Sequence, residues 1–430
     1  MAKLDINVHD ITRVEGHGNI VVNVTNGELQ QCELQITESP RLYEAMLVGR
    51  PWNEAAHITC RICGICSVGH TTASVRAMEN ALGVHPSEQT RLLRKLIMHG
   101  EFLQSHVLHV AFLALPDFLG VGSVIPLASS HPEAVKIALR LKRLANDICC
   151  AIGGRHIHPI AEVVGGWTKL PEPEALLGLK ERIVAAVPDV EAVVDLLSTV
   201  QVPAFERETE YLAVHHPSEY GITEGVIRSS LGDDTDEMNY LDKIKEFVVP
   251  HSHAKFVGTD KSPSHMAGAL ARFNINHAQL RSEATAVAEA LGLRAPCHNP
   301  YMITVAQMVE TVHCAYDALD LIDTLVARGI QPEKPDVAVR AGRGAAAVEV
   351  PRGILFHDYT VGADGLTTAA NLIIPTTQNL YNIENDMRAL VPQILDKSQD
   401  EIALALEMLV RAYDPCISCA THLLDVRFVQ

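Results

Sequence analysis

The chain has 430 residues, 47% of them hydrophobic, and a formal net charge of −17. This negative charge argues against nucleic acid as a partner, because a phosphate backbone is bound by surfaces rich in Lys and Arg. The sequence has no long uncharged apolar run that would span a membrane and no apolar core of a secretory signal, so we expect a cytoplasmic chain, or the cytoplasmic face of a larger assembly, without a membrane span.

The first 38 residues are predicted to form β structure. Apolar and polar residues alternate over 20–24, and the sequence returns as a second strand over 28–36. Asn26-Gly27 between these two runs is a strong signal for a tight hairpin turn. We therefore expect an N-terminal β-hairpin region.

From about residue 53 the apolar residues recur at helical spacing. The predicted helices cover residues 70–83, 86–115, 133–152, 174–199, 277–292 and 303–328. Pro86 is expected to open the second of these helices, and Pro116 is expected to stop it. Helices should therefore dominate the centre of the chain.

The C-terminal half is predicted to be more varied. Residues 230–262 are polar and indicate an irregular surface excursion, whereas 342–355 and 366–374 indicate short strands or extended loops. A last helix is expected over 396–411. Because no change of composition and no repeat marks a boundary, we expect one domain over residues 1–430, of the α+β class and mostly helical around a large core.

Two Cys-x-x-Cys pairs lie near opposite ends of the chain, Cys63/Cys66 and Cys416/Cys419. Four thiolates form a soft cage that suits transition metals. A local zinc site closes its second pair within about 15–20 residues of the first, whereas Cys66 and Cys416 are 350 positions apart. The spacing favours a metal buried between elements from both ends, and local structural zinc is the alternative.

The other candidate ligands have simpler interpretations. His99, His106 and His109 fall on one face of a predicted helix, where satisfied core histidines are favoured over a three-histidine metal site. The cysteines outside the two pairs lack the spacing of an iron–sulfur cluster, so none is expected in this chain. Small buried hydrophobes are predicted at Cys32, Cys149, Cys150, Cys297 and Cys314.

The segments around the cysteine pairs, RICGICSVGH over residues 61–70 and DPCISCATH over 414–422, resemble the large, catalytic subunit of nickel–iron hydrogenases. The form that these motifs take in this chain is most similar to the cytoplasmic, cofactor-coupled branch of that family. The resemblance implies the large-subunit fold and the reversible heterolytic oxidation of H2 to protons and electrons at a buried nickel–iron centre. Five further segments carry it, at residues 13–17 (RVEGH), 41–50 (RLYEAMLVGR), 153–159 (GGRHIHP), 351–353 (PRG) and 375–379 (PTTQN).

The resemblance assigns roles to the four paired cysteines. Cys63 and Cys416 are implied to bind nickel terminally, and Cys66 and Cys419 are implied to bridge nickel to iron. The iron is implied to carry carbon monoxide and two cyanides, which no side chain supplies. Metal coordination lowers the pKa of a thiol, so the cysteines would bind as thiolates.

Two further segments are implied to contact the iron ligands. Arg352, between Pro351 and Gly353, is implied to hydrogen-bond one cyanide and to act as a base or an electrostatic clamp, because a guanidinium stays protonated and donates in a fixed fork. Thr376, after Pro375, is implied to donate to the second cyanide. The alternative for Arg352 is a surface arginine at a turn.

The resemblance also implies a route for protons. Glu15 is its first relay after the Cys416 sulfur, since burial can raise the pKa of a glutamate toward the working pH. A solvated strand residue is the alternative for Glu15. His70 and Arg61 are expected to hydrogen-bond the cysteines or to close the cage.

A second metal site is implied near the C-terminus. Its ligands are Glu44, His422 and the main-chain carbonyl of Leu372. Magnesium is the usual metal, although it prefers oxygen ligands and a histidine ligand is unusual.

An iron–sulfur small subunit is implied to be the partner that takes the electrons, and further electron-transfer subunits are expected. NAD(P), a deazaflavin, ferredoxin and a heterodisulfide reductase all remain open as acceptors. Two other functions are also considered: a non-catalytic relative in a respiratory complex, which would lack the four cysteines, and a structural zinc protein. Only residues 423–430 follow His422, so the tail is interpreted either as a short uncleaved end or as a chain captured before processing.

Overall fold

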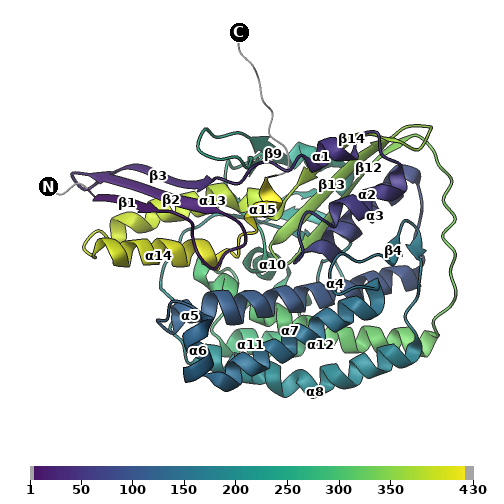
Figure 1. Cartoon of the computed structure of the whole chain (residues 1–430), viewed down its shortest axis with the longest axis horizontal. Coiled ribbons are helices and arrows are strands. Elements are labelled where there is room, and N and C mark those ends of the chain that lie inside the picture. The colour runs from purple at the N-terminus through teal and green to yellow at the C-terminus, as the bar shows by residue number, and fades with distance from the viewer. Residues whose placement is uncertain (1–3, 422–430) are drawn as a thin grey trace, which may run out of the picture.

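The computed structural model describes residues 4–421, so the predictions for His422 and for residues 423–430 lie outside the described part. A β-ribbon from the start of the chain, a layer of long helices and a small sheet from the C-terminal third meet around the centre of the molecule (Figure 1). This arrangement confirms an α+β fold that is mostly helical. No helix among residues 4–421 is long and apolar enough to cross a membrane.

The N-terminal ribbon is an antiparallel sheet in the order β1-β2-β3, formed by Leu4–Val8, Gly18–Thr25 and Glu28–Ile36. Every second residue of β2 is buried, as the alternation of apolar residues predicts. Asn26 and Gly27 have φ values of 54° and 82°, which a tight hairpin turn needs at both central positions. The predicted hairpin is confirmed.

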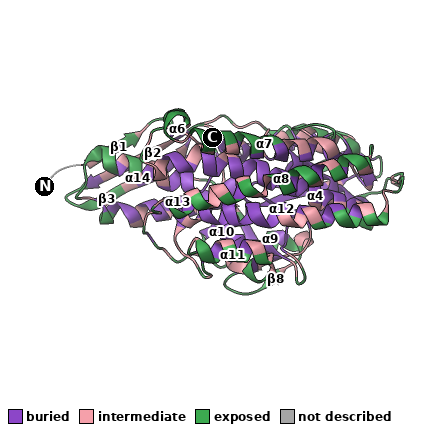
Figure 2. Ribbon diagram, turned by 90° about the horizontal axis from the view of Figure 1, so that it is seen from below, coloured by how far each residue is buried: buried purple, intermediate pink, exposed green. Residues whose placement is uncertain are grey.

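The long helices from the middle of the chain lie in one layer, in the lower part of the molecule (Figure 1). They are α4 (Glu88–Leu108), α7 (Pro132–Gly153), α8 (Pro173–Ser198), α11 (Ser282–Ala290) and α12 (Ile303–Arg328). α12 packs against α4, α8 and α11, and both α4 and α12 are buried over most of their length (Figure 2). The predicted bounds of α12 agree with the structure.

The remaining helices and strands lie around these layers. The other helices are α1 (Tyr43–Leu47), α2 (Ala55–Thr59), α3 (Ser67–Leu82), α5 (Leu115–Phe118), α6 (Val124–Ser130), α9 (Tyr240–Lys243), α10 (Ala269–Asn276), α13 (Pro375–Leu390), α14 (Gln399–Ala412) and α15 (Ile417–Ala420). Two small sheets are β4 (Glu162–Val163) with β5 (Gly166–Trp167), and β11 (His265–Met266), β6 (Glu210–His215), β7 (Val226–Ser229) and β8 (Asp234–Thr235) in that order.

Two predicted helix boundaries were wrong. α4 ends at Leu108 and the chain continues through a π-helical turn over His109–Ala114, so Pro116 lies in the first turn of α5 and does not stop a helix. Proline is tolerated there because a first-turn N–H needs no partner within the helix. The predicted helix over 277–292 is divided: His277–Gln279 form a 3-10 turn, Leu280 is extended, and the α-helix begins only at Ser282.

The prediction of an irregular surface excursion over 230–262 was also wrong. This stretch contains α9 and a two-stranded sheet of β9 (Ile244–Phe247) and β10 (Phe256–Thr259). Tyr240 is buried and stacks on Phe356 with ring centroids 5.0 Å apart. A few apolar residues therefore anchor a segment whose composition is otherwise polar.

The C-terminal sheet supports the site. β12 (Gly342–Val350), β13 (Gly353–Val361) and β14 (Thr367–Ile373) are antiparallel. The chain turns at residues 351–352, within the range 342–355 for which the sequence indicated a short strand or extended loop. α3 packs on β12 so closely that a Cβ atom on Gly344 would lie 2.2 Å from the carbonyl oxygen of Ala77. The missing side chain at Gly344 therefore allows the helix to approach the sheet. The sequence analysis missed α13, which follows β14.

We predict that the buried His313 makes the fold sensitive to acid. Burial lowers the pKa of His313 from 6.5 to about 3, so between these values the unfolded chain binds a proton that the folded chain does not. The free energy of unfolding should therefore decrease as the pH falls through this window. His313→Gln should reduce the fall in denaturation temperature between about pH 7 and about pH 5, measured against His57→Gln at an exposed histidine. Equal falls in wild type and His313→Gln would contradict this assignment.

Candidate metal centre

The four cysteines of the two pairs meet at the centre of the molecule. Cys63 and Cys66 lie on the turn before α3, whereas Cys416 directly precedes α15 and Cys419 lies within α15, which follows α14. The Sγ atoms of Cys63 and Cys416 are 3.5 Å apart, those of Cys66 and Cys419 are 3.6 Å apart, and all four lie within 4.8 Å of one another. The predicted convergence of the two ends is confirmed, and within residues 4–421 no other cluster of His, Cys, Asp and Glu side chains has such ligand geometry.

The buried thiols respond to one another electrostatically. Hydrogen bonds from Cys416 and its neighbours hold the pKa of Cys63 well below its usual value. Burial raises the pKa of Cys419 well above its usual value, because a thiolate is poorly solvated there. Ionisation is thus favoured at Cys63 and opposed at Cys419. A soft cation bound among the four sulfurs would favour thiolates at all four positions.

The turn that carries Cys416 is held by two distant segments. The Thr376 hydroxyl oxygen accepts a 3.0 Å hydrogen bond from the backbone N–H of Cys416. The carbonyl oxygen of Glu15 accepts a 2.9 Å bond from the N–H of Ile417, and Glu15 and Cys416 form a parallel β-bridge. Gly16 allows this approach, since a Cβ atom there would lie 2.7 Å from Cβ of Ile417.

The Glu15 side chain reaches the Sγ atom of Cys416 directly. Its Oε2 atom accepts hydrogen bonds from Sγ of Cys416 at 3.2 Å and from the backbone N–H of Ser418 at 3.1 Å. Glu15 is half-buried in the loop between β1 and β2, which differs from the solvated strand residue of the alternative interpretation. Its carboxylate is placed to accept a proton from the cysteine.

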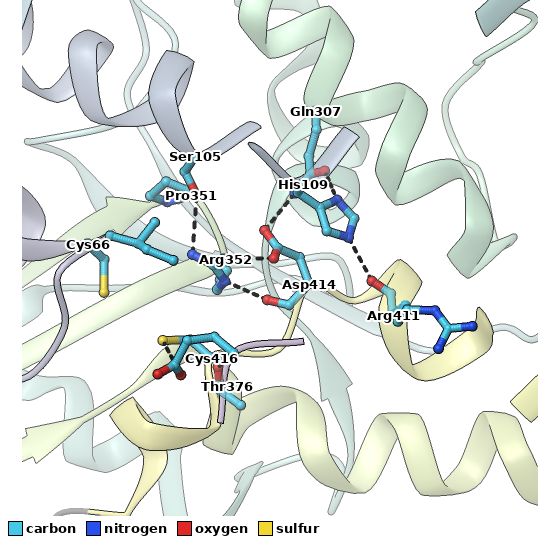
Figure 3. Close-up of polar contacts among 12 residues, drawn as sticks. Cys66, Ser105, His109, Gln307, Pro351, Arg352, Thr376, Arg411, Asp414 and Cys416 are labelled. Atoms are coloured by element: carbon cyan, nitrogen blue, oxygen red, sulfur yellow. Dashed lines mark hydrogen bonds and ion pairs between the residues drawn. The ribbon is translucent and has the colours of Figure 1, made fainter. Parts of the chain in front are cut away.

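Arg352 is buried above the sulfurs, at the turn between β12 and β13 (Figure 3). Its Nε and Nη2 atoms donate to the carbonyl and the Oδ1 atom of Asp414 at 2.5 and 2.7 Å, and Nη1 donates to the Ser105 hydroxyl at 3.2 Å. The alternative of a surface arginine is wrong, because only 5% of the residue is exposed. A guanidinium has five N–H donors, so two of them have no partner among the described residues and are available to the metal cavity.

The cavity between Arg352 and the sulfurs is mostly apolar. Pro375 and Thr376 lie in its wall, as does His70, but Pro351 does not. The imidazole of His70 bonds through Nδ1 to Nε2 of His357 at 3.1 Å. Arg61 is exposed, and the expectation that it closes the cage was wrong because its side chain lies beside Cys60.

Asp414 and Glu101 are two acids that the sequence analysis left without a role. Asp414 joins Arg352 to Gln307, whose Nε2 donates to Oδ2 at 3.2 Å (Figure 3). Glu101 is fully buried and accepts from the backbone N–H groups of Val68 and Gly69 at the start of α3. Burial raises the pKa of Glu101 to about 8. An acid within an apolar helical face was the available signal for Glu101.

The three histidines on and beside α4 do not form one metal site. Nε2 of His99 bonds to Asp317 at 2.7 Å, and Nε2 of His106 bonds to Glu310 at 2.8 Å. His109 bonds through one nitrogen to the side chain of Gln307 and through the other to the carbonyl of Arg411 (Figure 3). The prediction of core histidines with protein partners is confirmed.

The predicted magnesium ligands are only partly placed. Glu44 is buried, and its Oε1 atom accepts a 2.8 Å hydrogen bond from the backbone N–H of Leu372. The two residues are therefore neighbours, although the bond uses the N–H group and not the carbonyl of Leu372. His422 lies outside the described residues, so this site stays a prediction.

Sequence comparisons identify close resemblances over nearly the whole chain. A family profile described as nickel-dependent hydrogenase matches residues 41–138 and 261–422, and one described as HoxL-like matches 5–39. The alpha chain of sulfhydrogenase 1 from Pyrococcus furiosus is 34% identical over 97% of this chain and 98% of its own. A component of the F420-non-reducing hydrogenase from Methanothermobacter marburgensis is 30% identical over 98% of this chain and 95% of its own.

Solved structures share the fold. An NAD+-reducing NiFe-hydrogenase in its H2-reduced state matches with a TM-score of 0.89 and 28% identity, over 97% of this chain and 99% of that one. The Ni-Fe-Se hydrogenase of D. vulgaris Hildenborough matches with a TM-score of 0.78 and 24% identity, over 98% of this chain and 100% of that one. The predicted large-subunit fold is confirmed.

We predict that the cysteine cluster holds nickel and iron and fails when one thiol is lost. Cys419→Ser should remove both metals from the purified chain, because a serine hydroxyl does not ionise to replace a bridging thiolate. Cys150→Ser is the matched control at a half-buried cysteine outside the cluster and should retain them. Elemental analysis for nickel, iron and zinc decides the outcome, and zinc alone in the wild type would support the structural zinc alternative.

Proposed function

Because the chain belongs to the nickel-dependent hydrogenase family, we propose that its four converging cysteines hold a nickel–iron centre. Cys63 and Cys416 would bind nickel terminally, and Cys66 and Cys419 would bridge nickel to iron. One observation carries the proposal: four buried Sγ atoms from both ends of the chain lie within 4.8 Å of one another. Thiolates in this number and softness suit nickel and iron.

The chain is a hydrogenase, and we place the reversible reaction H2 ⇌ 2 H⁺ + 2 e⁻ at this centre. The bound centre would supply the two-electron chemistry of hydrogen heterolysis, with carbon monoxide and two cyanides on the iron. The side chains around it exclude water, since Val350, Leu355 and Ile374 line the cavity. The low dielectric constant of this apolar cavity strengthens every hydrogen bond made to the centre.

Two side chains fit the proposed cyanides. Arg352 has two N–H groups without a partner among the described residues, and its side chain lines the same cavity as Cys66, Cys416 and Cys419. The Thr376 oxygen accepts from the N–H of Cys416, which leaves its O–H to donate. Arg352 would therefore donate to one cyanide and Thr376 to the other, and the fixed charge of Arg352 would favour negative charge at the centre.

Glu15 is proposed to take the proton. Its carboxylate already accepts from Sγ of Cys416, so a proton leaving that sulfur has an acceptor at 3.2 Å. The N–H of Ser418 holds the same oxygen in place. General acid–base transfer requires this hydrogen-bond reach, and a half-buried carboxyl can pass the proton outward.

Electrons require a second polypeptide, which we propose to be an iron–sulfur small subunit with further electron-transfer subunits beyond it. The similar proteins are themselves named as single subunits of their hydrogenases. Leu42, Met46 and Val48 are large exposed hydrophobics around α1, and the Tyr43 hydroxyl of this helix bonds to the carbonyl of Arg61 in the Cys63 turn. Exposed apolar patches mark interaction sites, so this face is proposed for the partner.

Magnesium at Glu44 and a cytoplasmic location stay predictions.

The decisive experiment uses the complex with its small subunit. Infrared spectra should show separate bands for iron-bound carbon monoxide and cyanide, and H2 should reduce an electron-accepting dye. A non-catalytic relative would show neither result. Bands without dye reduction would support the centre and contradict the assigned activity.

We predict that Glu15→Gln slows proton transfer while it leaves the centre intact. Glutamine keeps the volume and an acceptor for the Ser418 N–H but does not take a proton. Loss of a general base typically slows turnover by about 10²–10⁴-fold, with metal content and infrared bands retained. Glu33→Gln is a control at a half-buried carboxyl of β3. Unchanged H2-dependent turnover in Glu15→Gln would remove Glu15 from the relay.

A further inference from the structure

We propose that Arg272 is a positioning residue: it fixes the backbone from which Arg352 extends over the metal centre. This inference rests on the proposed role of Arg352. Arg272 lies in α10, far from both cysteine pairs in the sequence, and its side chain is fully buried. It does not line the metal cavity, so any effect on the reaction must pass through Arg352.

Arg272 uses its whole guanidinium in two kinds of contact. Nε and Nη2 form a two-point ion pair with Glu310 at 2.6 and 2.7 Å, and Nη1 pairs with Glu349 at 2.7 Å. The other two N–H groups donate to the carbonyls of Val350 and Pro351 at 2.9 and 2.8 Å. All five donors are therefore occupied, and the last two contacts bind the peptide groups directly before Arg352.

The two carboxylates hold the Arg272 head in one place. Glu310 also accepts from the hydroxyl of Tyr220 at 2.7 Å and contacts His106 at 2.8 Å. Glu349 also accepts from the backbone N–H of Val214 at 2.8 Å. Each acid is thus fixed by a second element, and buried charged networks of this kind are rigid when every member has its partner.

The start of α10 also packs against the turn itself. The N–H of Arg272 donates to the carbonyl of Gly268, and a Cβ atom on Gly268 would lie 3.0 Å from the carbonyl oxygen of Arg352. Gly353, with φ of 135°, faces the same segment, since its Cβ position lies 3.0 Å from the nitrogen of Gly268. The backbone of the turn has little room to shift while α10 is in place.

Arg352 is consequently held at both ends. Asp414 and Ser105 orient its guanidinium, and Arg272 fixes the backbone that carries it. Misplacement by about 1 Å far from the chemistry can slow an enzyme by roughly 10²-fold. By holding the carbonyls of Val350 and Pro351, the buried Arg272 guanidinium therefore orients the two N–H groups of Arg352 that have no partner among the described residues.

The test compares Arg272→Lys with Arg94→Lys in the complete complex. Lysine keeps the charge but has three donors on one atom, so it does not serve two acids and two carbonyls together. Arg94 is the matched control: it is buried and bridges Glu79 and Glu162 at 2.6 and 2.9 Å, and neither acid lines the metal cavity. Both variants should lose stability to a similar degree.

Only Arg272→Lys should change the centre. We expect its cyanide stretching bands to shift in the direction produced by Arg352→Lys, and turnover to fall roughly tenfold to a hundredfold with the KM for H2 little changed. Arg94→Lys should keep the wild-type bands. Unshifted bands in Arg272→Lys, or equal shifts in both variants, would overturn the positioning role.

A milder variant decides the case if Arg272→Lys does not accumulate. Glu349→Gln keeps the volume and one acceptor oxygen for Arg272 but removes the negative charge and the acceptor for the N–H of Val214. It should give a smaller shift of the same bands. Wild-type bands in Glu349→Gln would then overturn the inference. Absence of carbon monoxide and cyanide bands from the wild-type complex would instead contradict the proposed nickel–iron centre, so the two failures are distinguishable.

Discussion

The structure depends on bringing four thiols from opposite ends of the chain into one buried space. Hydrogen bonds among these thiols lower the pKa of Cys63, while burial raises that of Cys419, so negative charge is not accommodated equally at the four positions. Holding them within reach of one another therefore requires rigid supports. The parallel bridge between Glu15 and Cys416 and the contact from Thr376 supply them, so the N-terminal loop, α13 and the C-terminal turn form one unit.

The second feature on which the site depends is the buried positive charge of Arg352, close to the sulfurs, and of Arg272 behind it. Arg352 is buried with Asp414 beside it, and Arg272 lies behind its backbone with two acids. Ion pairs of this kind add little net stability, because desolvation offsets the Coulomb attraction. Their effect here is geometric: the ion pairs hold the N–H donors of Arg352 and Arg272 in fixed positions in a buried region of the protein. The same logic explains why Glu101 and the core histidines are each held by defined partners.

Local patterns predicted regular elements well and irregular ones poorly. The hairpin at Asn26-Gly27 and the bounds of α12 followed from periodicity and turn chemistry. Pro116 was misjudged because a proline that stops one helix can equally begin the next. Residues 230–262 were misjudged because burial there depends on partners such as Phe356, which lies more than 100 positions from Tyr240.

The amino-acid sequence was enough to indicate a thiolate metal site and to identify the family. Each cysteine pair and its flanking motif is a short run of consecutive residues, so it can be recognised without knowledge of the tertiary structure. It also singled out Glu15, Arg352 and Thr376 by their segments. Three contacts emerged only from the folded chain: Glu15 with Cys416, Asp414 with Arg352, and Arg272 with the turn behind Arg352. These contacts join residues that are distant along the chain, and their geometry follows from packing, which no local pattern encodes.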